Sequence, residues 1–167
     1  MQSSFPSQTT SWHQWWQSEG GVFFLYARQQ TRSEADAKDV LQDALIEAWR
    51  KSGNALPEKA IVFATIRRRA IDLGRSTDRR SRRENEVATD RAEWFMPDFA
   101  DFDTHQRISE AIAGLSPDVR EVLVLRIWGD LTFPAIAQLM DTPVATATSR
   151  YRYALEQLRE TLTELKI

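Results

Sequence analysis

The chain has 167 residues, of which 42% are hydrophobic and 28% are charged, and its formal net charge is −2. This composition is typical of a globular protein and excludes a chain that is disordered throughout. The sequence contains no cysteine, which excludes disulfides and thiolate zinc sites and suits a cytoplasmic protein. No apolar run approaches the roughly 20 residues that a membrane-spanning helix needs, so we expect no membrane insertion.

The first helical pattern covers residues 12–30 and follows a polar stretch that we expect to be a frayed tail. Aromatic and aliphatic side chains recur there at helical spacing, although Gly20 and Gly21 weaken the pattern at its middle. No acidic or cationic pocket residues accompany the aromatic side chains. We therefore predict that they belong to a hydrophobic core and do not form a ligand cage.

The segment 33–51 is the clearest helix of the sequence. Ser33 can cap its start, and Glu34 and Asp36 suit the positive end of the helix dipole. Its apolar residues recur at i, i+3, i+4 and i+7, which predicts one buried face. The opposite face is polar; periodicity alone favours a solvent-facing surface and leaves a docking surface for another protein as the alternative. That face carries Asp36, Asp39, Gln42, Asp43, Glu47 and Arg50.

A loop at 52–57 separates this segment from a further helix, which we predict from Lys59 to about Arg75. Between residues 59 and 83 there are nine basic residues and two acidic ones, a local charge of +7. Such a density of like charge repels itself unless an anion is nearby, so nucleic acid is the natural partner. A solvated basic tail is the alternative.

The sign of the local charge then reverses between residues 84 and 110, a stretch that contains eight acidic residues and two arginines. Aromatic side chains are scattered there without clear periodicity, and Pro97 interrupts them. The stretch therefore predicts an acidic linker between two domains.

The C-terminal part contains three further helical patterns. A cap and first-position proline at Ser116-Pro117 begin the first, and the other two meet at the tight turn 141–143 within the stretch 131–159. We expect Thr142 to be the N-cap of the last helix and Pro143 its first residue. The apolar stripe of that helix is predicted to be Ala147, Tyr151, Ala154, Leu155 and Leu158.

This pair of helices has the layout of a helix-turn-helix, whose second helix enters the major groove of DNA. An ordinary helical hairpin with a polar face is the alternative. Hydroxyl side chains can read either base type, and arginines can bind guanine edges or phosphates. The predicted DNA-binding side chains are Thr146, Thr148, Ser149, Arg150 and Arg152.

Motifs that would indicate an enzyme are missing from the sequence. We find no Walker phosphate loop, no Gly-x-Gly-x-x-Gly, no His-Glu-x-x-His and no Gly-x-Ser-x-Gly. His13 and His105 lack partners at ligand spacing. We therefore predict no catalytic residues, no metal site and no cofactor.

Two separated blocks of the sequence resemble a known family, the extracytoplasmic-function (ECF) sigma factors of the bacterial sigma-70 superfamily. Segment 36–50, DAKDVLQDALIEAWR, looks like the family's helix that binds the clamp of core RNA polymerase. The resemblance thus implies that its polar face docks on polymerase, against the solvent-facing interpretation. The polymerase-binding residues would be Asp36, Asp39, Gln42, Asp43 and Glu47.

Segment 63–73, FATIRRRAIDL, looks like the family's helix that melts and reads the minus-ten promoter element. The family often has Trp where this chain has Ile61 and Asn where it has Arg68. We expect Phe63 to be a core residue rather than a stacking platform for a base. The resemblance implies minus-ten contacts by Arg67, Arg68, Arg69, Asp72 and Arg75.

In the second block, LSPDVREVLVLR at 115–126 is similar to the opening helices of the family's last domain. TFPAIA at 132–137 and PVATATSR at 143–150 match its helix-turn-helix, which reads the minus-35 element. Where the family commonly carries Gly-Thr-Val-Lys-Ser-Arg, this chain has ATATSR at 145–150.

The resemblance implies an all-α fold of two small helical domains joined by an acidic linker, with the helix-turn-helix in the C-terminal one. The domains would be 12–85, like sigma region 2, and 105–167, like sigma region 4, with the linker at 86–104. In the family, this linker threads the polymerase's product channel.

The implied function is that of a sigma factor, with core RNA polymerase and promoter DNA as partners; whether an anti-sigma factor also binds stays open. A free-standing helix-turn-helix regulator and a sequestering interaction protein without a DNA role are alternatives. The acidic-faced helix 36–50 and the separate basic helix favour the sigma factor, and the local charge of +7 argues against the third hypothesis.

Overall fold

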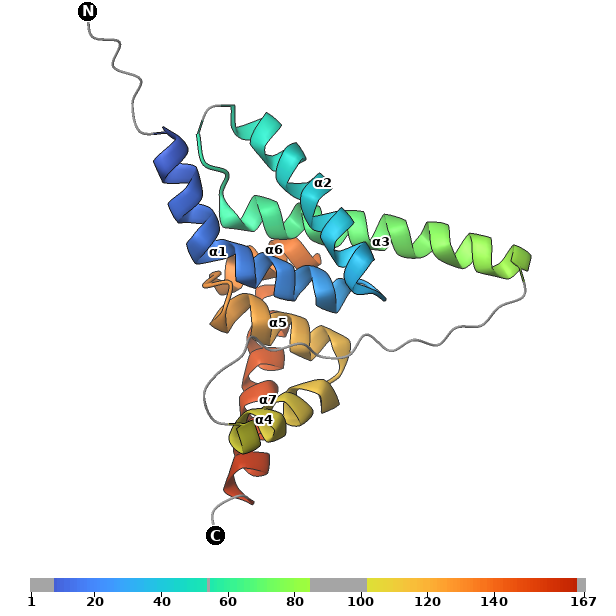
Figure 1. Cartoon of the computed structure of the whole chain (residues 1–167). Coiled ribbons are helices and arrows are strands. Elements are labelled where there is room, and N and C mark those ends of the chain that lie inside the picture. Colours follow the sequence, from blue (N-terminus) through green and yellow to red (C-terminus); the bar gives the residue numbers. More distant parts are fainter. Residues whose placement is uncertain (1–7, 54, 85–101, 165–167) are drawn as a thin grey trace, which may run out of the picture.

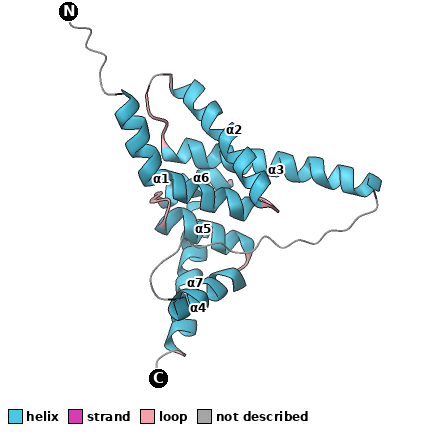
Figure 2. Cartoon of the chain, viewed as in Figure 1, coloured by secondary structure: helices cyan, strands magenta, loops and turns pink. Residues whose placement is uncertain are grey.

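The structure, a computed structural model, describes residues 8–53, 55–84 and 102–164. Every regular element in these ranges is a helix, as the all-α prediction requires (Figure 1, Figure 2). The helices are α1 (Gln8–Gln30), α2 (Glu34–Ser52), α3 (Lys59–Glu84), α4 (Phe102–Gly114), α5 (Pro117–Ile127), α6 (Phe133–Met140) and α7 (Val144–Thr163).

Several helix boundaries differ from the prediction. α1 begins at Gln8 and continues through its two glycines, and the Trp16 ring packs where a Cβ on Gly20 would stand, 2.8 Å from it. α3 continues to Glu84, because no proline or glycine interrupts the arginine-rich stretch after residue 75 and arginine is a good helix former. α4 begins at Phe102, before the expected domain start, and residues 86–101 of the predicted linker lie outside the described residues.

The N-terminal lobe, α1–α3, is organised around three aromatic rings. Phe23, Tyr26 and Phe63 are completely buried, and both Phe23 and Tyr26 meet the Phe63 ring edge-on at centroid distances of 4.9 and 5.2 Å. Edge-to-face pairs of this kind are the favoured aromatic geometry. Phe63 is therefore a core residue, as predicted. The second half of α3 projects beyond the other helices (Figure 1).

The predicted aromatic core in α1 is confirmed in its second half and only partly in its first. Phe23, Leu25 and Tyr26 are buried, whereas Trp15 is half-buried and Trp16 is 40% exposed. The tryptophans lie in the early turns of α1, where they border the lobe and do not fill it. Trp15 still packs on Phe23, with ring centroids 5.4 Å apart.

The C-terminal lobe, α4–α7, packs α5 and α4 against the last helix and places α6 toward the N-terminal lobe (Figure 1). Arg120 joins α4 to α5, since its guanidinium donates to the Ile112 and Leu115 carbonyls at 3.1 and 2.9 Å. Burial lowers the pKa of Arg120 from its usual value. A small core of this lobe consists of Ile112, Leu115, Val119, Leu123 and Ala154.

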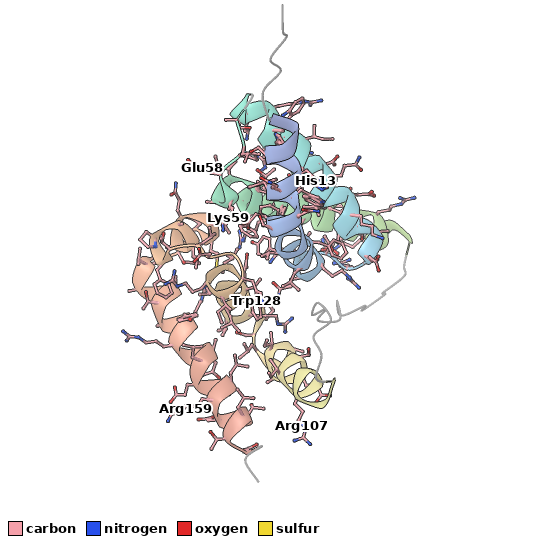
Figure 3. The ribbon with its side chains drawn as sticks, turned by 60° about the vertical axis from the view of Figure 1, so that its left-hand side comes forward. His13, Glu58, Lys59, Arg107, Trp128 and Arg159 are labelled. Carbon is pink, nitrogen blue, oxygen red and sulfur yellow. The ribbon has the colours of Figure 1, made fainter. Side chains whose placement is uncertain are left out.

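The two lobes are in direct contact and share one larger core. α3 contacts α6 and α1 contacts α5, so side chains of α5 and α6 join those of α1–α3 in a single buried cluster. Trp128, labelled in Figure 3, packs against both this shared core and the small core of the C-terminal lobe. The C-terminal members of the shared core are Val122, Val124, Leu125, Leu131, Ile136, Ala137, Met140 and Ala147.

Substitution of Phe63 by alanine tests the importance of the aromatic cluster. We expect a loss of about 3–5 kcal/mol in the free energy of unfolding, because the change removes a fully buried ring and leaves a cavity. Urea unfolding followed by circular dichroism measures it. Ile61→Ala, on the same helix but 41% exposed, should cost less than about 1 kcal/mol, and equal costs would contradict the assignment.

Candidate nucleic-acid interface

The turn between α6 and α7 closes tightly. Asp141 ends α6 in the left-handed conformation, with φ 52°, which aspartate tolerates better than most residues. The Thr142 amide donates to the Ala137 carbonyl at 3.0 Å. The N-cap of α7 is Pro143 and not Thr142, so the predicted cap was one residue early, and the Thr142 hydroxyl is buried without a hydrogen-bond partner.

The junction of α5, α6 and α7 is held by one arginine. Arg126 donates to the Leu131 carbonyl at 2.9 Å, and its guanidinium carbon lies 5.0 Å from the centre of the Phe133 ring. Phe133 in turn meets Tyr151 of α7 edge-on at 5.4 Å. These contacts fix the angle at which α7 leaves the turn.

The outer face of α7 carries the predicted DNA-binding side chains. Ser149 and Arg152 are exposed, while Thr146, Thr148 and Arg150 are half-buried. The Thr148 and Ser149 hydroxyls donate to helix carbonyls at 2.9 and 3.0 Å, which leaves their oxygens able to accept. All five side chains therefore reach the surface of the helix.

Arg150 is already engaged within the chain. Its guanidinium donates to Asp118 of α5 at 3.0 Å, and the Asp118 side chain is 61% exposed. Exposed ion pairs contribute about 0–1 kcal/mol, so a phosphate or a guanine edge can displace this carboxylate at little cost. The Arg150 side chain is 24% exposed in this pair, so part of its guanidinium can still be reached from the surface.

The predicted apolar stripe of α7 was wrong at one position. Ala147 and Ala154 are buried and Tyr151 and Leu158 are half-buried, but Leu155 is 41% exposed. The covered positions follow i, i+4, i+7 and i+11, a narrow stripe. Leu155 lies about 100° around the helix from Ala154 and so points away from α4 and α5.

The basic face of α3 borders a pocket between the two lobes. This pocket has a volume of about 220 Å³ and includes Leu139 of α6 in its lining. Four of the five predicted minus-ten residues, Arg67, Arg68, Asp72 and Arg75, line it together with Ala64 and Ile71. The fifth, Arg69, lies apart and is directed toward α2.

The carboxylate of Glu47 on α2 forms ion pairs with three cationic side chains. Glu47 accepts from Arg69 at 2.8 and 3.1 Å, pairs with Lys51 at 2.8 Å and contacts Arg68 closely. These hydrogen bonds, from Lys51 first and then the two arginines, lower the pKa of Glu47 from 4.5 to about 2. Glu47 is 19% exposed, so of the predicted docking residues it is the most engaged within the protein.

The rest of the predicted docking face lies open. Asp39, Gln42 and Asp43 are exposed, and Asp36 is half-buried beside the cap of α2. Two apolar side chains near this face, Ile46 and Trp49, were not predicted to be functional and are 39% and 51% exposed. Their sequence positions could have indicated this exposure, because both large apolar residues fall outside the i, i+3, i+4 stripe that α2 buries. Large exposed apolar side chains of this kind are typical of protein-binding surfaces.

A buried polar contact between the lobes was also not predicted. Glu121 of α5 is buried, and its Oε1 accepts from the Tyr26 hydroxyl at 2.6 Å and from Arg67 Nε at 3.0 Å. Burial, followed by the charge and hydrogen bond of Glu121, raises the pKa of Tyr26 well above its usual value. Tyr26 is thus a neutral donor at physiological pH. The sequence offered one sign of this contact: Glu121 is an acidic residue within an otherwise apolar segment, between Val119 and Val122.

Comparison with known proteins identifies the family. The family model "Sigma-70, region 4" matches residues 105–158, which include the helix-turn-helix. A curated relative, the ECF RNA polymerase sigma factor SigL of Mycobacterium tuberculosis, is 31% identical over 156 residues, covering 87% of this chain and 85% of SigL. The chain belongs to the ECF sigma factor family. This confirms the resemblance inferred from the two sequence blocks.

Other relatives of this ECF sigma factor agree. The RNA polymerase sigma-H factor of Pseudomonas aeruginosa is 31% identical over 145 residues, covering 78% of this chain and 75% of its own. A solved structure of the sigma factor RpoE from Bartonella quintana, in complex with the anti-sigma factor NepR, has the same fold, with a TM-score of 0.72 and 22% identity. That match covers 92% of this chain and 98% of the RpoE chain.

The described part of this ECF sigma factor lacks two other kinds of feature, a metal-binding cluster and a membrane-spanning helix. Its residues 8–53, 55–84 and 102–164 contain no group of three acidic or histidine side chains placed to hold a metal ion. None of the helices in those same ranges is both long and apolar enough to cross a membrane.

Glu47→Gln tests the cation-collecting carboxylate. Because the folded-state pKa of Glu47 lies below its unfolded value, its contribution is present above about pH 4.5 and is lost as the pH falls toward 2. The contribution should be about 1 kcal/mol, since the group lies near the surface and water screens it. Urea unfolding of both proteins at several pH values measures it.

The same series with Asp39→Asn, an exposed carboxylate on the same helix, should show little difference from the parent protein. A Glu47→Gln effect that stays constant from pH 7 to pH 2 would contradict the assignment.

Proposed function

We propose that this ECF sigma factor binds core RNA polymerase and directs promoter-specific transcription initiation in the cytoplasm. The proposal rests on the presence of two basic faces in this chain, one on the helix-turn-helix of the C-terminal lobe and one on α3 of the N-terminal lobe. The recognition helix carries Arg150 and Arg152 in the C-terminal lobe, and α3 carries Arg67, Arg68 and Arg75 in the N-terminal lobe. Two nucleic-acid faces on separate lobes suit a promoter read at two places.

The chemistry of α7 suits readout of duplex DNA. Helix-turn-helix proteins place the N-terminal residues of the second helix against base edges in the major groove. Thr146, Ser149 and Arg150 occupy the first two turns of α7, and Arg152 follows on the exposed side. Arginines supply guanine or phosphate contacts, and the hydroxyls supply adaptable ones. We assign minus-35 recognition to this face, with Thr148 where the family commonly has lysine.

The chemistry of α3 suits a separated strand. Its arginines supply the phosphate contacts that dominate affinity, and Asp72 in the same pocket can accept from an exocyclic base amine. Unpairing a base costs a few kcal/mol, so selection of an extruded base can add sequence specificity. We assign minus-ten recognition to Arg67, Arg68, Asp72 and Arg75, with Arg69 held toward α2 by Glu47.

The open face of α2 suits docking on polymerase. It combines the exposed acids Asp39 and Asp43 with the exposed side chains Ile46 and Trp49. Interfaces commonly join an apolar centre to a polar rim, and complementary charge raises the rate of encounter. We assign docking to Asp36, Asp39, Gln42 and Asp43. Glu47, paired with three cations, lies at the edge of this face.

Asp43→Arg tests the docking face. We expect the affinity for purified core RNA polymerase to fall roughly tenfold, because the substitution puts a like charge at a complementary surface. A pull-down with titrated core polymerase, followed by in vitro transcription, measures it. Glu156→Arg, an exposed carboxylate on α7, is the matched control and should bind core normally.

If the unmodified chain fails to bind core polymerase but binds duplex DNA tightly by itself, the proposal fails and the chain is a free-standing regulator. If it binds neither polymerase nor DNA, it acts only through another protein partner.

Arg150→Ala tests the recognition helix. We expect the variant to lose about 1–3 kcal/mol of affinity for the upstream promoter element, roughly 5- to 150-fold, with core binding unchanged. Footprinting with reconstituted holoenzyme measures the affinity for the promoter element, and the pull-down measures core binding. Arg159→Ala, farther along α7 and exposed near the end of the C-terminal lobe (Figure 3), should keep both. Equal losses of both in Arg150→Ala would indicate unfolding.

A further inference from the structure

The pocket beside α3 presents charges of both signs within two turns of helix. Arg68, Asp72 and Arg75 follow one another at i, i+4 and i+7, and all three line it. The acid therefore lies about 5–6 Å along the helix axis from each arginine. A ligand that carries an anionic group close to a hydrogen-bond donor matches this order. A bare anion meets the arginines but is repelled by Asp72.

The charged groups of this pocket are available to a ligand. Asp72 and Arg75 are exposed, and neither side chain has a hydrogen bond or ion pair with another described residue. Opposite charges three residues apart on a helix often pair, so this pair is left open to an outside partner. Arg68 is 52% exposed where it contacts Glu47, and such pairs contribute little, so a phosphate can share this guanidinium.

An apolar wall completes the pocket. Ala64 and Ile71 supply it from α3, and Leu139 supplies it from α6 of the other lobe. A planar ring can lie against these side chains and bury part of their apolar surface, which favours binding. The volume of about 220 Å³ is below the roughly 300–1,000 Å³ of sites that enclose a drug-sized molecule, so the ligand is small and partly open to water.

We propose that this pocket binds a free nucleoside phosphate whose base carries an exocyclic amine. Arg68 and Arg75 hold the phosphate groups, whose geometry suits guanidinium forks. Asp72 accepts from the amine, as carboxylates do from cytosine N4. Ile71 and Leu139 pack on the base. The phosphates, the amine and the ring of a nucleotide thus each have a partner in the lining.

A nucleotide in this pocket regulates the α3 face. Arg68, Asp72 and Arg75 are also assigned to the minus-ten element, so nucleotide and DNA compete for the same side chains. This competition rests on the proposed function. The nucleotide site itself does not, because it stands on the lining of the pocket alone.

Isothermal titration of the full chain with CTP and with UTP tests the recognition of the base. The two probes differ in an amino group against a carbonyl oxygen, which a carboxylate distinguishes. We expect CTP to bind at least roughly fivefold more tightly than UTP. Inorganic tripolyphosphate, which has the charge without the base, should bind more weakly than CTP. EDTA in the buffer keeps divalent cations from neutralising the phosphates.

Three variants show which side chains hold the nucleotide. Asp72→Asn should abolish the preference for CTP over UTP, because an amide both donates and accepts. The readout is the ratio of the two affinities, since loss of the acid's charge strengthens the binding of every anion. Arg75→Ala should weaken both nucleotides roughly tenfold. Arg159→Ala removes the same charge from an exposed position outside the pocket and should keep the parent affinities.

The nucleotide site is overturned if CTP at millimolar concentration does not bind, or if CTP, UTP and tripolyphosphate bind equally. Equal losses in Arg75→Ala and Arg159→Ala overturn it too, because they indicate attraction by overall charge. Leu139→Ala tests the place of the ligand and should weaken CTP binding while every charge is kept. If this variant is folded by circular dichroism and binds CTP as the parent does, the ligand is not in the pocket.

The competition has its own measurement. At concentrations that fill its site in the titration, CTP should displace a labelled thymine-rich single-stranded oligonucleotide from the chain, followed by fluorescence anisotropy. An oligonucleotide that stays bound while CTP fills its site overturns the competition. Failure of the parent protein to bind core polymerase refutes the proposed function instead, and the titration still judges the nucleotide site.

Discussion

One helix, α3, has to serve the interior and the exterior of the protein at once, and the rest of the structure depends on how its surface is divided. Val62, Phe63 and Ile66 are fully buried and complete the core of the N-terminal lobe. Arg67 and Arg68 follow them directly; Arg67 lies at the flank of this buried face and bonds to Glu121 of α5, and Arg68 points outward. Burial of the first set fixes the helix rigidly, so the arginines are presented on a stiff scaffold. Rigid presentation lowers the entropy lost when such side chains bind a partner.

The cations on that helix are stabilised by acids from neighbouring helices. Glu47 of α2 holds Arg68 and Arg69, and Glu121 of α5 holds Arg67. Successive residues of a helix point in different directions, which is why Glu121 of α5 reaches Arg67 and Glu47 of α2 reaches Arg69. The acidic residues therefore have two effects: they neutralise the arginines in the folded protein, and they compete with any phosphate for the same arginines.

Local pattern was enough to predict the helices and the faces they bury, because periodicity and capping act within a few turns. Ser33 caps α2 as predicted, with its hydroxyl accepting from the Asp36 amide at 3.1 Å, and Phe63 lies in the core. Helix ends were less predictable. α3 extends beyond the predicted end at Arg75, because arginine is a good helix former and no proline or glycine follows within the helix. The N-cap of α7 is Pro143, one residue beyond the predicted Thr142.

Contacts between the lobes could not be predicted from the sequence. Tyr26 and Glu121 are 95 residues apart, and neither has a local feature that names the other. Glu121 lies within the family-like segment 115–126, and Glu47 lies on the predicted docking face of α2. The pairing of each with arginines depends on tertiary packing. The resemblance supplied the family and the candidate faces, but the partners of individual side chains came only with the structure.

The three kinds of acid–arginine pair differ mainly in how much water reaches them, and this difference decides how easily another anion can replace each acid. The Asp118–Arg150 pair is exposed, and exposed pairs contribute about 0–1 kcal/mol, so α7 can exchange Asp118 for DNA without rearrangement. Glu47 shares its charge among three cations and can release Arg68 while keeping Arg69 and Lys51. Glu121 is buried, with its side chain 7% exposed, and it accepts a hydrogen bond from Arg67 between the lobes. Of the three pairs, Asp118–Arg150 therefore costs least to exchange for a phosphate, and Glu121–Arg67 costs most.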